Sequence, residues 1–264
     1  MRHLVRLFTL FMLLAVVGCT AQKRNPVVYM IGDSTMANKG GLPKNKERGW
    51  GQMLPLFVDS TLVIVNKATN GRSTKSFRDE GRWQPIMDSM KQGDYVIIQF
   101  GHNDEKSEQP KLYADSEVDF PNNLKRYITE TREKGGIPIL CTSIPRRHFD
   151  ENGQLIDTHG NYVTVVFKVA EEMDVPLIDM NKSVTALIKS VPEEDSKMFF
   201  MWYPPSKQDN THLNVLGGKI VAKLAIDEIA EKVPALKRYT VKDSENIREV
   251  APYIEGAKNY MKNE

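Results

Sequence analysis

The chain has 264 residues, of which 41% are hydrophobic and 27% are charged. This length and composition are typical of a globular protein with one core of good size, and they predict a single large domain. Lysine and arginine total 36 against 34 acidic residues, so the formal net charge is only +2. This balance argues against a nucleic-acid-binding protein.

The first 18 residues have the pattern of an export signal. Arg2 and Arg6 precede the apolar run LFTLFMLLAVV, which is too short to span a bilayer. Cys19 follows directly after small residues, an arrangement that resembles the bacterial lipoprotein processing site. We therefore expect residues 1–18 to be removed, Cys19 to be lipidated as the mature N-terminus, and the protein to be a periplasmic or cell-surface lipoprotein of a bacterium. A plain secretion signal or a transmembrane anchor is the alternative.

Removal of this signal would take away two arginines and no acidic residue, which leaves a mature chain without net charge. Apart from Cys19, the sequence contains one cysteine, Cys141, within the apolar stretch IPILCTSIP. The mature protein then has no pair of free cysteines for an intramolecular disulfide, and Cys141 is expected to be a buried strand residue. We expect contact with a membrane only through the lipid on Cys19.

Short apolar runs rich in β-branched residues recur along the chain and predict buried parallel strands. They cover residues 27–31, 62–65, 95–100, 137–142 and 175–178. Helical spacing of apolar residues predicts helices over 122–134, 162–173 and 215–233. The alternation predicts an α/β protein, a three-layer α/β/α sandwich with a central parallel sheet. We expect one domain over 26–238, followed by a charged C-terminal extension, 239–264, as a peripheral appendage.

Polar residues and glycines follow directly after three of the predicted strands. In open parallel sheets, ligands bind beyond the carboxyl ends of the strands, so these positions are candidate site residues. The three segments are Gly32-Asp33-Ser34-Thr35, Asn70-Gly71-Arg72-Ser73 and Gly101-His102-Asn103-Asp104. Further along, a short turn would let Asp209 orient the ring of His212. Each segment alone is equally compatible with a helix cap or a turn.

Taken in order, the four segments match the four sequence blocks of the SGNH (GDSL) hydrolase superfamily. Over about residues 26–235, the motifs GDST, NGRS, GHND and DNTH resemble those of its rhamnogalacturonan acetylesterases. The first block reads GDST where the family name implies GDSL, which bears on the subgroup more than on activity. The resemblance implies the flavodoxin-like sandwich of that superfamily.

The resemblance also implies the roles of the site residues. Ser34 would be the nucleophile, His212 its general base and then acid, and Asp209 the residue that orients the imidazole. The oxyanion hole would consist of the backbone N–H groups of Ser34 and Gly71 and the side-chain amide of Asn103. The reaction would be two acyl transfers that need no metal and no organic cofactor.

By the same resemblance, the protein is expected to be a carbohydrate esterase that removes acetyl groups from plant cell-wall pectin, namely rhamnogalacturonan. Its partner would be an acetylated polysaccharide or oligosaccharide, and we expect a monomer. Arg72 and Arg78 are candidates to bind uronate carboxylates, and Trp202 is a candidate to stack on a sugar ring. A solvated basic face neutralised by Asp79 and Glu80 is the alternative for the arginines.

Other functions fit the sequence less well. An esterase of the same superfamily that acts on acetyl xylan or on another short-chain ester is the nearest alternative. A non-catalytic lipoprotein would bind glycans through exposed aromatic residues and arginines, such as Trp83, Trp202, Tyr203, Arg146 and Arg147, but would leave the serine, histidine and aspartate unexplained. A dinuclear metallophosphoesterase lacks its histidine ligands here, and an ordinary α/β-hydrolase lacks its Gly-x-Ser-x-Gly elbow.

Overall fold

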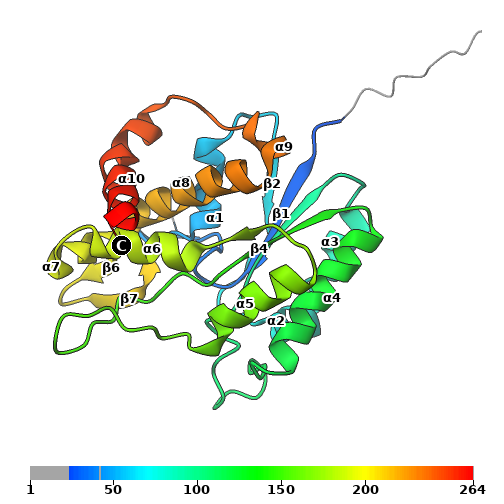
Figure 1. Ribbon diagram of the computed structural model, residues 1–264, viewed down its shortest axis with the longest axis horizontal. Coiled ribbons are helices and arrows are strands. Elements are labelled where there is room, and N and C mark those ends of the chain that lie inside the picture. Colours follow the sequence, from blue (N-terminus) through cyan, green and yellow to red (C-terminus); the bar gives the residue numbers. More distant parts are fainter. Residues whose placement is uncertain (1–23, 42, 264) are drawn as a thin grey trace, which may run out of the picture.

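The structure is a computed structural model that describes residues 24–41 and 43–263 (Figure 1). Its central feature is a five-stranded sheet, in which every pair of neighbouring strands is parallel. The strands are β1 (Val27–Gly32), β2 (Val63–Asn66), β3 (Tyr95–Gln99), β4 (Ile137–Cys141) and β5 (Leu177–Ile178). The predicted parallel sheet is confirmed, while the signal peptide and Cys19 lie outside the described residues.

The alternation of apolar residues along each strand supplies both faces of the sheet. In β1, Val28 and Met30 belong to one buried cluster, whereas Tyr29 and Ile31 belong to the other. A strand that buries both faces needs cover on both sides, because side chains point alternately up and down. The predicted three-layer α/β/α sandwich is therefore confirmed, and Cys141 is buried in β4 as expected.

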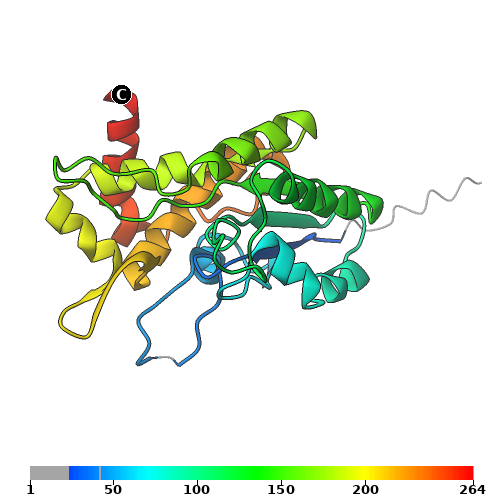
Figure 2. The same cartoon turned by 90° about the horizontal axis from the view of Figure 1, so that it is seen from below.

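Helices of two groups cover the two faces (Figures 1 and 2). One group comprises α1 (Trp50–Met53), α6 (Met180–Lys189), α8 (Val215–Lys232) and α10 (Glu245–Asn263). The other comprises α2 (Thr74–Asp79), α3 (Gln84–Ser89), α4 (Asp119–Glu133) and α5 (Asn161–Glu172). The remaining short helices are η1 (Leu54–Phe57), α7 (Glu193–Ser196), η2 (Lys197–Phe199) and α9 (Pro234–Lys237). The three predicted helices correspond to α4, α5 and α8.

The order of the strands, β2-β1-β3-β4-β5, determines where a ligand site can form. The chain moves outward from β1 to β2, then crosses back to β3 on the other side of β1. Between β1 and β3 the connections therefore leave the sheet in opposite directions, which opens a crevice beyond the carboxyl ends of these two strands. Ser34 follows β1 and Asn103 follows β3, so both candidate residues lie at this switch point.

A small antiparallel hairpin lies outside the main sheet. It consists of β6 (Phe200–Tyr203) and β7 (Lys207–Leu213), and in Figure 2 it extends on the same side of the molecule as the loop that follows β1. Phe200 pairs with Leu213, but Trp202 already pairs with Gln208, so β7 contains a bulge between these pairs. The turn predicted around Asp209 and His212 lies in this bulge.

The C-terminal extension differs from the expected peripheral appendage. Its helix α10 packs against α6 and α8, and it buries Val250, Ile254 and Ala257 in the same cluster as those helices. Tyr253 also meets Phe199 edge to face, with 5.5 Å between ring centroids. Charged residues dominate the sequence pattern here because they cover the outer side of α10, while every third or fourth residue enters the core.

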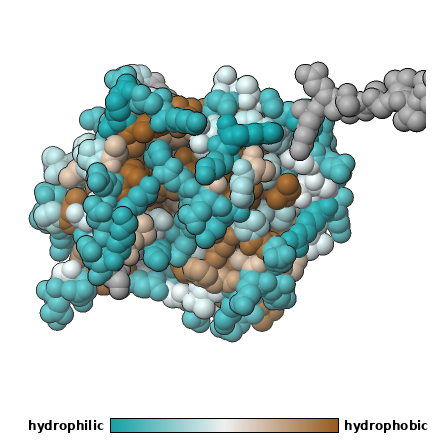
Figure 3. All heavy atoms as spheres, turned by 45° about the horizontal axis from the view of Figure 1, so that its top comes forward, coloured by the Kyte–Doolittle hydropathy of each residue, from teal (hydrophilic) through white to brown (hydrophobic). Residues whose placement is uncertain are grey.

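The surface combines hydrophilic residues with apolar residues that show between them, as Figure 3 illustrates for one face. Such a distribution is ordinary for globular proteins, whose surfaces always include apolar atoms. Within residues 24–41 and 43–263, no helix has the length and apolar character needed to cross a membrane.

Candidate active site

Ser34 lies in the turn that leaves β1 at the switch point of the sheet. The buried carboxylate of Asp33 holds this turn, because its Oδ1 accepts hydrogen bonds from the backbone N–H and the hydroxyl of Thr35, both at 2.8 Å. The backbone carbonyl of Asp33 accepts from the N–H groups of Met36 and Ala37. Asp33 thus braces the loop and leaves the Ser34 side chain half-buried.

His212 and Asp209 come from the hairpin and meet Ser34 across the crevice. The Nε2 atom of His212 is 2.9 Å from Ser34 Oγ, although the two residues are 178 positions apart in the sequence. On the other side of the ring, Nδ1 is 2.8 Å from Asp209 Oδ2. The hydroxyl can donate to Nε2 while Nδ1–H donates to the carboxylate, which is the geometry of a serine–histidine–aspartate triad.

Asp209 is held as a carboxylate. Partial burial acts to raise its pKa, but hydrogen bonds from the His212 ring and from the backbone N–H groups of His212 and Thr211 outweigh burial and keep the pKa well below its ordinary value. Lys207 Nζ lies 3.5 Å from Asp209 Oδ2 and places a cation beside the carboxylate. An ionised Asp209 orients the imidazole and stabilises its protonated form.

Arg147 fixes the bulge that carries this pair. The side chain is only 4% exposed, and it donates to Asn210 Oδ1 at 3.0 Å, Ser196 Oγ at 2.7 Å and the Glu193 carbonyl at 2.8 Å. The backbone N–H of Arg147 also donates to the Asn210 carbonyl, at 2.8 Å. Asn210, which directly follows Asp209, is therefore held through both its backbone and its side chain.

The sequence predicts two backbone donors for an oxyanion hole, the N–H groups of Ser34 and Gly71. The backbone N–H groups of Ser34 and Gly71 form no hydrogen bond within the described residues, whereas the next amides, those of Thr35 and Arg72, do. Gly71 has φ +72, a conformation that favours glycine. An added Cβ would meet no atom within 4 Å there, so the requirement comes from the backbone conformation alone.

Asn103 supplies the third donor. Lys106 Nζ donates to Asn103 Oδ1 at 2.8 Å, and Asn103 Nδ2 donates to the Arg72 carbonyl at 3.0 Å. These two contacts fix the orientation of the amide, and they leave the second hydrogen of Nδ2 for a ligand. The contact with the Arg72 carbonyl also connects the loop after β3 to the segment of Gly71.

Two carboxyl groups are buried in the loops that carry Ser34 and Asn103. Burial raises the pKa of Asp104 to about 7, although its Oδ1 accepts from the backbone N–H and the hydroxyl of Thr74. Burial likewise raises the pKa of Asp33, against the hydrogen bonds from Thr35. Within the described residues the Oδ2 atoms of both have no hydrogen-bond partner. Asp104 thus joins the first residue of α2 to the loop after β3 and braces both segments.

His102 is also buried beside this loop. Burial, together with His159 and Arg146, holds its pKa well below the ordinary value, so the ring is neutral. Its ring packs edge to face on that of His159, with centroids 4.5 Å apart. His159 in turn contacts Glu105 Oε2 and the Ile144 carbonyl, each at 2.9 Å. The pair ties the loop after β3 to the loop after β4.

The two arginines predicted to bind substrate, Arg72 and Arg78, both form ion pairs within the protein. Arg72 lies beside the oxyanion donors, but its Nε pairs with Glu80, which also binds Arg82. Arg78 was expected to bind substrate, but its guanidinium pairs with Glu130 of α4 and lies over the Tyr127 ring. Only 14% of that side chain is exposed, so it serves packing.

Trp202 is half-buried on β6, beside the bulge, with Lys197 Nζ 4.7 Å and the Arg147 guanidinium 5.7 Å from its ring. The alternative of a glycan-binding surface loses two of its residues, because Trp83 and Arg147 are buried. Trp83 instead packs on Tyr127 in the core between the sheet and α4.

Several residues that shape the site have no distinguishing pattern in the sequence. The position of Arg147 in the sequence suggests a surface residue rather than a buried brace. Lys39, whose ammonium donates to the Ser34 carbonyl, is a single lysine in a loop rich in glycine and lysine. Only the three-dimensional contacts of these side chains reveal their roles.

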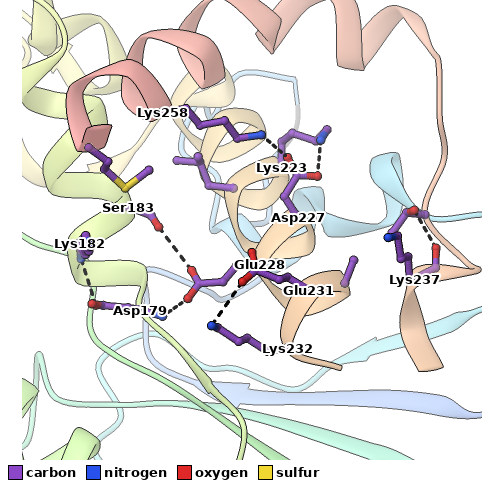
Figure 4. Close-up of a pocket in the computed structure, with 14 residues that line it drawn as sticks. Asp179, Lys182, Ser183, Lys223, Asp227, Glu228, Glu231, Lys232, Lys237 and Lys258 are labelled. Atoms are coloured by element: carbon purple, nitrogen blue, oxygen red, sulfur yellow. Dashed lines mark hydrogen bonds and ion pairs between the residues drawn. The ribbon is translucent and has the colours of Figure 1, made fainter. Parts of the chain in front are cut away.

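A hollow of about 660 Å³ lies elsewhere, between α6, α8 and α10 (Figure 4). None of the triad residues lines it. Its charged side chains pair with one another: Lys223 and Lys258 both bind Asp227, and Glu228 accepts from the Asp179 backbone N–H. These contacts hold the three helices together and do not converge on one point. The described residues also contain no cluster of three or more histidine, cysteine or acidic side chains that could hold a metal ion.

The raised pKa of Asp104 makes stability depend on pH. The ordinary pKa of an aspartate is about 3.9, so between about pH 4 and pH 7 the unfolded chain has lost this proton while the folded protein retains it. The free energy of unfolding is therefore expected to fall by on the order of 4 kcal/mol over this range through Asp104 alone. Asp104→Asn should remove that component and gain stability relative to the native protein as the pH rises.

Urea denaturation of both proteins at several pH values measures this difference. The matched control Asp88→Asn changes an exposed carboxyl on α3 and should show no such trend. A difference between native protein and Asp104→Asn that stays constant from pH 4 to pH 8 would show that Asp104 does not retain its proton.

Comparison with known proteins agrees with this geometry. Residues 30–220 match the model of the GDSL-like Lipase/Acylhydrolase family. The rhamnogalacturonan acetylesterase RhgT of Bacillus subtilis is 37% identical over 224 residues, covering 81% of this chain and 94% of RhgT.

Solved structures give the same result for the fold. The crystal structure of YxiM from Bacillus subtilis superimposes with a TM-score of 0.72 at 30% identity, over 80% of this chain and 58% of YxiM. A catalytic mutant of Axe2, an acetylxylan esterase from Geobacillus stearothermophilus, matches with a TM-score of 0.57 at 19% identity, over 77% of this chain and 94% of that chain. The chain therefore belongs to the GDSL-like lipase/acylhydrolase family, and it is an esterase.

Proposed function

We propose that the protein hydrolyses acetyl esters of rhamnogalacturonan through an acetyl-enzyme formed on Ser34. The observation that carries the mechanism is the continuous contact from Ser34 Oγ through His212 to Asp209, with distances of 2.9 Å and 2.8 Å. A serine hydroxyl is a weak nucleophile until a base accepts its proton, and the His212 ring is positioned to do so.

In the first half of the reaction, Ser34 Oγ attacks the acetyl carbonyl carbon while its proton passes to His212 Nε2. The carbonyl oxygen becomes an oxyanion, which the N–H groups of Ser34 and Gly71 and the amide of Asn103 bind. The intermediate then collapses, and the sugar oxygen leaves with the proton from His212. Asp209 stabilises the imidazolium that exists between these two proton transfers.

In the second half, water attacks the acetyl-enzyme. His212 accepts a proton from the water, the same three donors bind the second oxyanion, and Ser34 Oγ leaves with the proton as acetate is released. Every charge that develops is met by a group already in place, so little reorganisation is needed during the reaction. All steps use side chains and backbone of this chain.

The substrate assignment rests on the relatives and on the residues around the site. RhgT, at 37% identity over most of both chains, is named a rhamnogalacturonan acetylesterase. Trp202 offers a half-buried aromatic ring next to the bulge of Asp209 and His212, and Lys197, whose ammonium lies 4.7 Å from that ring and pairs with the exposed Glu194, adds a cation there. An aromatic face suits a sugar ring, and a cation suits the carboxylate of a uronic acid.

We also propose that the enzyme is exported as a monomeric lipoprotein anchored through Cys19. The described chain enters β1 at the amino end of the strand, whereas Ser34 follows its carboxyl end, and at the entry Asp94 accepts from Arg24 and from the Val27 N–H. In Figure 1 this entry lies on the right and the hairpin of His212 on the left. An anchor five residues before Arg24 would therefore hold the crevice away from the membrane, toward a polymeric substrate.

The substrate and the nucleophile are tested together by acetate release from polysaccharides. The signal-free protein is expected to release acetate from acetylated rhamnogalacturonan faster than from acetylated homogalacturonan or acetylated xylan. Ser34→Ala should lower the rate to background, because no other nucleophile is in position, and His212→Ala should lower it nearly as far.

The outcomes separate the substrate from the mechanism. Preference for xylan, with activity that still depends on Ser34, would discard the pectin assignment and retain the triad. Undiminished release by Ser34→Ala would discard the mechanism. Binding to these glycans without any release would favour a non-catalytic glycan-binding lipoprotein.

Removal of the side-chain donor tests the oxyanion hole. Asn103→Ala is expected to lower kcat on the order of a hundredfold while changing KM little, because the donor acts on the oxyanion more than on the substrate. Steady-state kinetics on a small acetyl ester measure both constants, and Asn152→Ala, in an exposed loop, is the matched control. An Asn103→Ala enzyme with native kcat would exclude this side chain from the oxyanion hole.

A further inference from the structure

Lys39 is a buried lysine whose ammonium group lies next to the nucleophile. Only 2% of its side chain is exposed. Its Nζ donates to the Ser34 backbone carbonyl and to Asn70 Oδ1, both at 2.6 Å, and it pairs with Glu47 Oε1 at 2.8 Å. An ammonium has three N–H donors and no acceptor, so these contacts use its complete hydrogen-bonding capacity.

Two of these partners belong to the segments that supply the backbone donors of the oxyanion hole. Ser34 contributes its own N–H, and Asn70 directly precedes Gly71. The two segments follow different strands, β1 and β2, and the ammonium of Lys39 joins them. We propose that Lys39 is a positioning residue that sets the separation of the Ser34 and Gly71 N–H groups. This role extends the proposed mechanism and rests on it.

The surroundings of Lys39 make the connection rigid. Its backbone N–H donates to Gln52 Oε1 at 3.0 Å, and its carbonyl accepts from Gln52 Nε2 at 3.4 Å, so the backbone is held on both sides. Glu47 is held by Lys207 at 3.3 Å and by a backbone bridge to Asn214, just before α8. Side-chain freedom is thereby removed at both ends of the ion pair.

The three partners of Lys39 require a charged donor group, and that group in turn requires a counter-ion. A neutral side chain of similar length lacks three donors, so at least one of the Ser34 carbonyl, the Asn70 amide and the Glu47 carboxylate would lose its partner. A buried cation is costly without a counter-ion, and Glu47 supplies one. Burial acts to raise the pKa of Glu47, but the hydrogen bond and charge of Lys39 outweigh it and lower the pKa, so the carboxylate stays ionised.

The same ion pair also reaches the triad. Lys207 Nζ, which contacts Glu47, lies 3.5 Å from Asp209 Oδ2. One alternating series of charges, from Lys39 through Glu47 and Lys207 to Asp209, therefore connects the oxyanion hole to the acid of the triad. No other residue that we describe contacts both the Ser34 carbonyl and the segment of Gly71 through one side chain.

A positioning role has a kinetic signature. Lys39→Met should lower kcat roughly 10- to 100-fold with KM little changed, because misplaced donors weaken binding of the oxyanion more than binding of the ester. Methylboronic acid forms a tetrahedral adduct with an active serine, in which one oxygen occupies the oxyanion hole. Its inhibition constant should therefore rise by about the same factor as kcat falls.

Two further variants keep the test independent of folding. Lys39→Met/Glu47→Gln removes the carboxylate that Lys39→Met alone would leave unpaired, and it should show the same signature. Asn70→Ala removes one arm of the connection at an exposed residue, and a several-fold loss in kcat with a matching rise in the boronate constant is expected. Lys125→Met, at a lysine that pairs with Glu172 between α4 and α5, is the matched control.

The results distinguish this role from the mechanism on which it rests. Matched losses in kcat and boronate binding for Asn70→Ala and the double variant would support positioning by Lys39. Variants with native thermal unfolding midpoints that bind methylboronic acid as tightly as the native enzyme would overturn it. A native enzyme that methylboronic acid does not inhibit would instead contradict the serine mechanism itself.

Discussion

The structure depends on the reversal of strand order between β1 and β3. The crossover connections leave the sheet in opposite directions at this point, so the backbone beyond the two strands is not covered by a helix. The turn after β1 can therefore present the Ser34 side chain and leave its N–H without an acceptor. The loop after β3 presents Asn103 from the other side, and Asp33 and Asp104 brace these loops from below.

The base of the triad reaches this crevice from a different part of the fold. His212 lies in a bulge of the β6–β7 hairpin, and a regular strand would not bring both its ring and the Asp209 carboxylate toward Ser34. Arg147 holds the bulge through Asn210, and the last strand residue leads directly into α8. The reactive side chains therefore come from loops, while the sheet and the large helix fix the positions of those loops.

Much of this arrangement follows from local sequence patterns. The strands carry short apolar runs, and the proposed triad and oxyanion residues occur in short motifs, so the sequence predicts both sets of positions. The C-terminal helix α10 was judged peripheral because charged residues obscure the few apolar positions, Val250 among them, that enter the core. Arg78 was misjudged because its partner, Glu130, lies 52 positions away and only the packing of α2 on α4 brings them together. Contacts between segments distant in the sequence also account for Lys39 and Arg147.

The central claim is that Ser34 carries the acyl group between the two half-reactions. It is tested most directly by mixing the enzyme with an activated acetyl ester, quenching with acid within the first turnovers and mapping the peptides by mass spectrometry. The account predicts that the peptide containing Ser34 gains the mass of one acetyl group, and that the adduct is absent in Ser34→Ala and accumulates when hydrolysis is slowed. Hydrolysis at full rate with no acetylated peptide, or with acetylation at another residue, would contradict it.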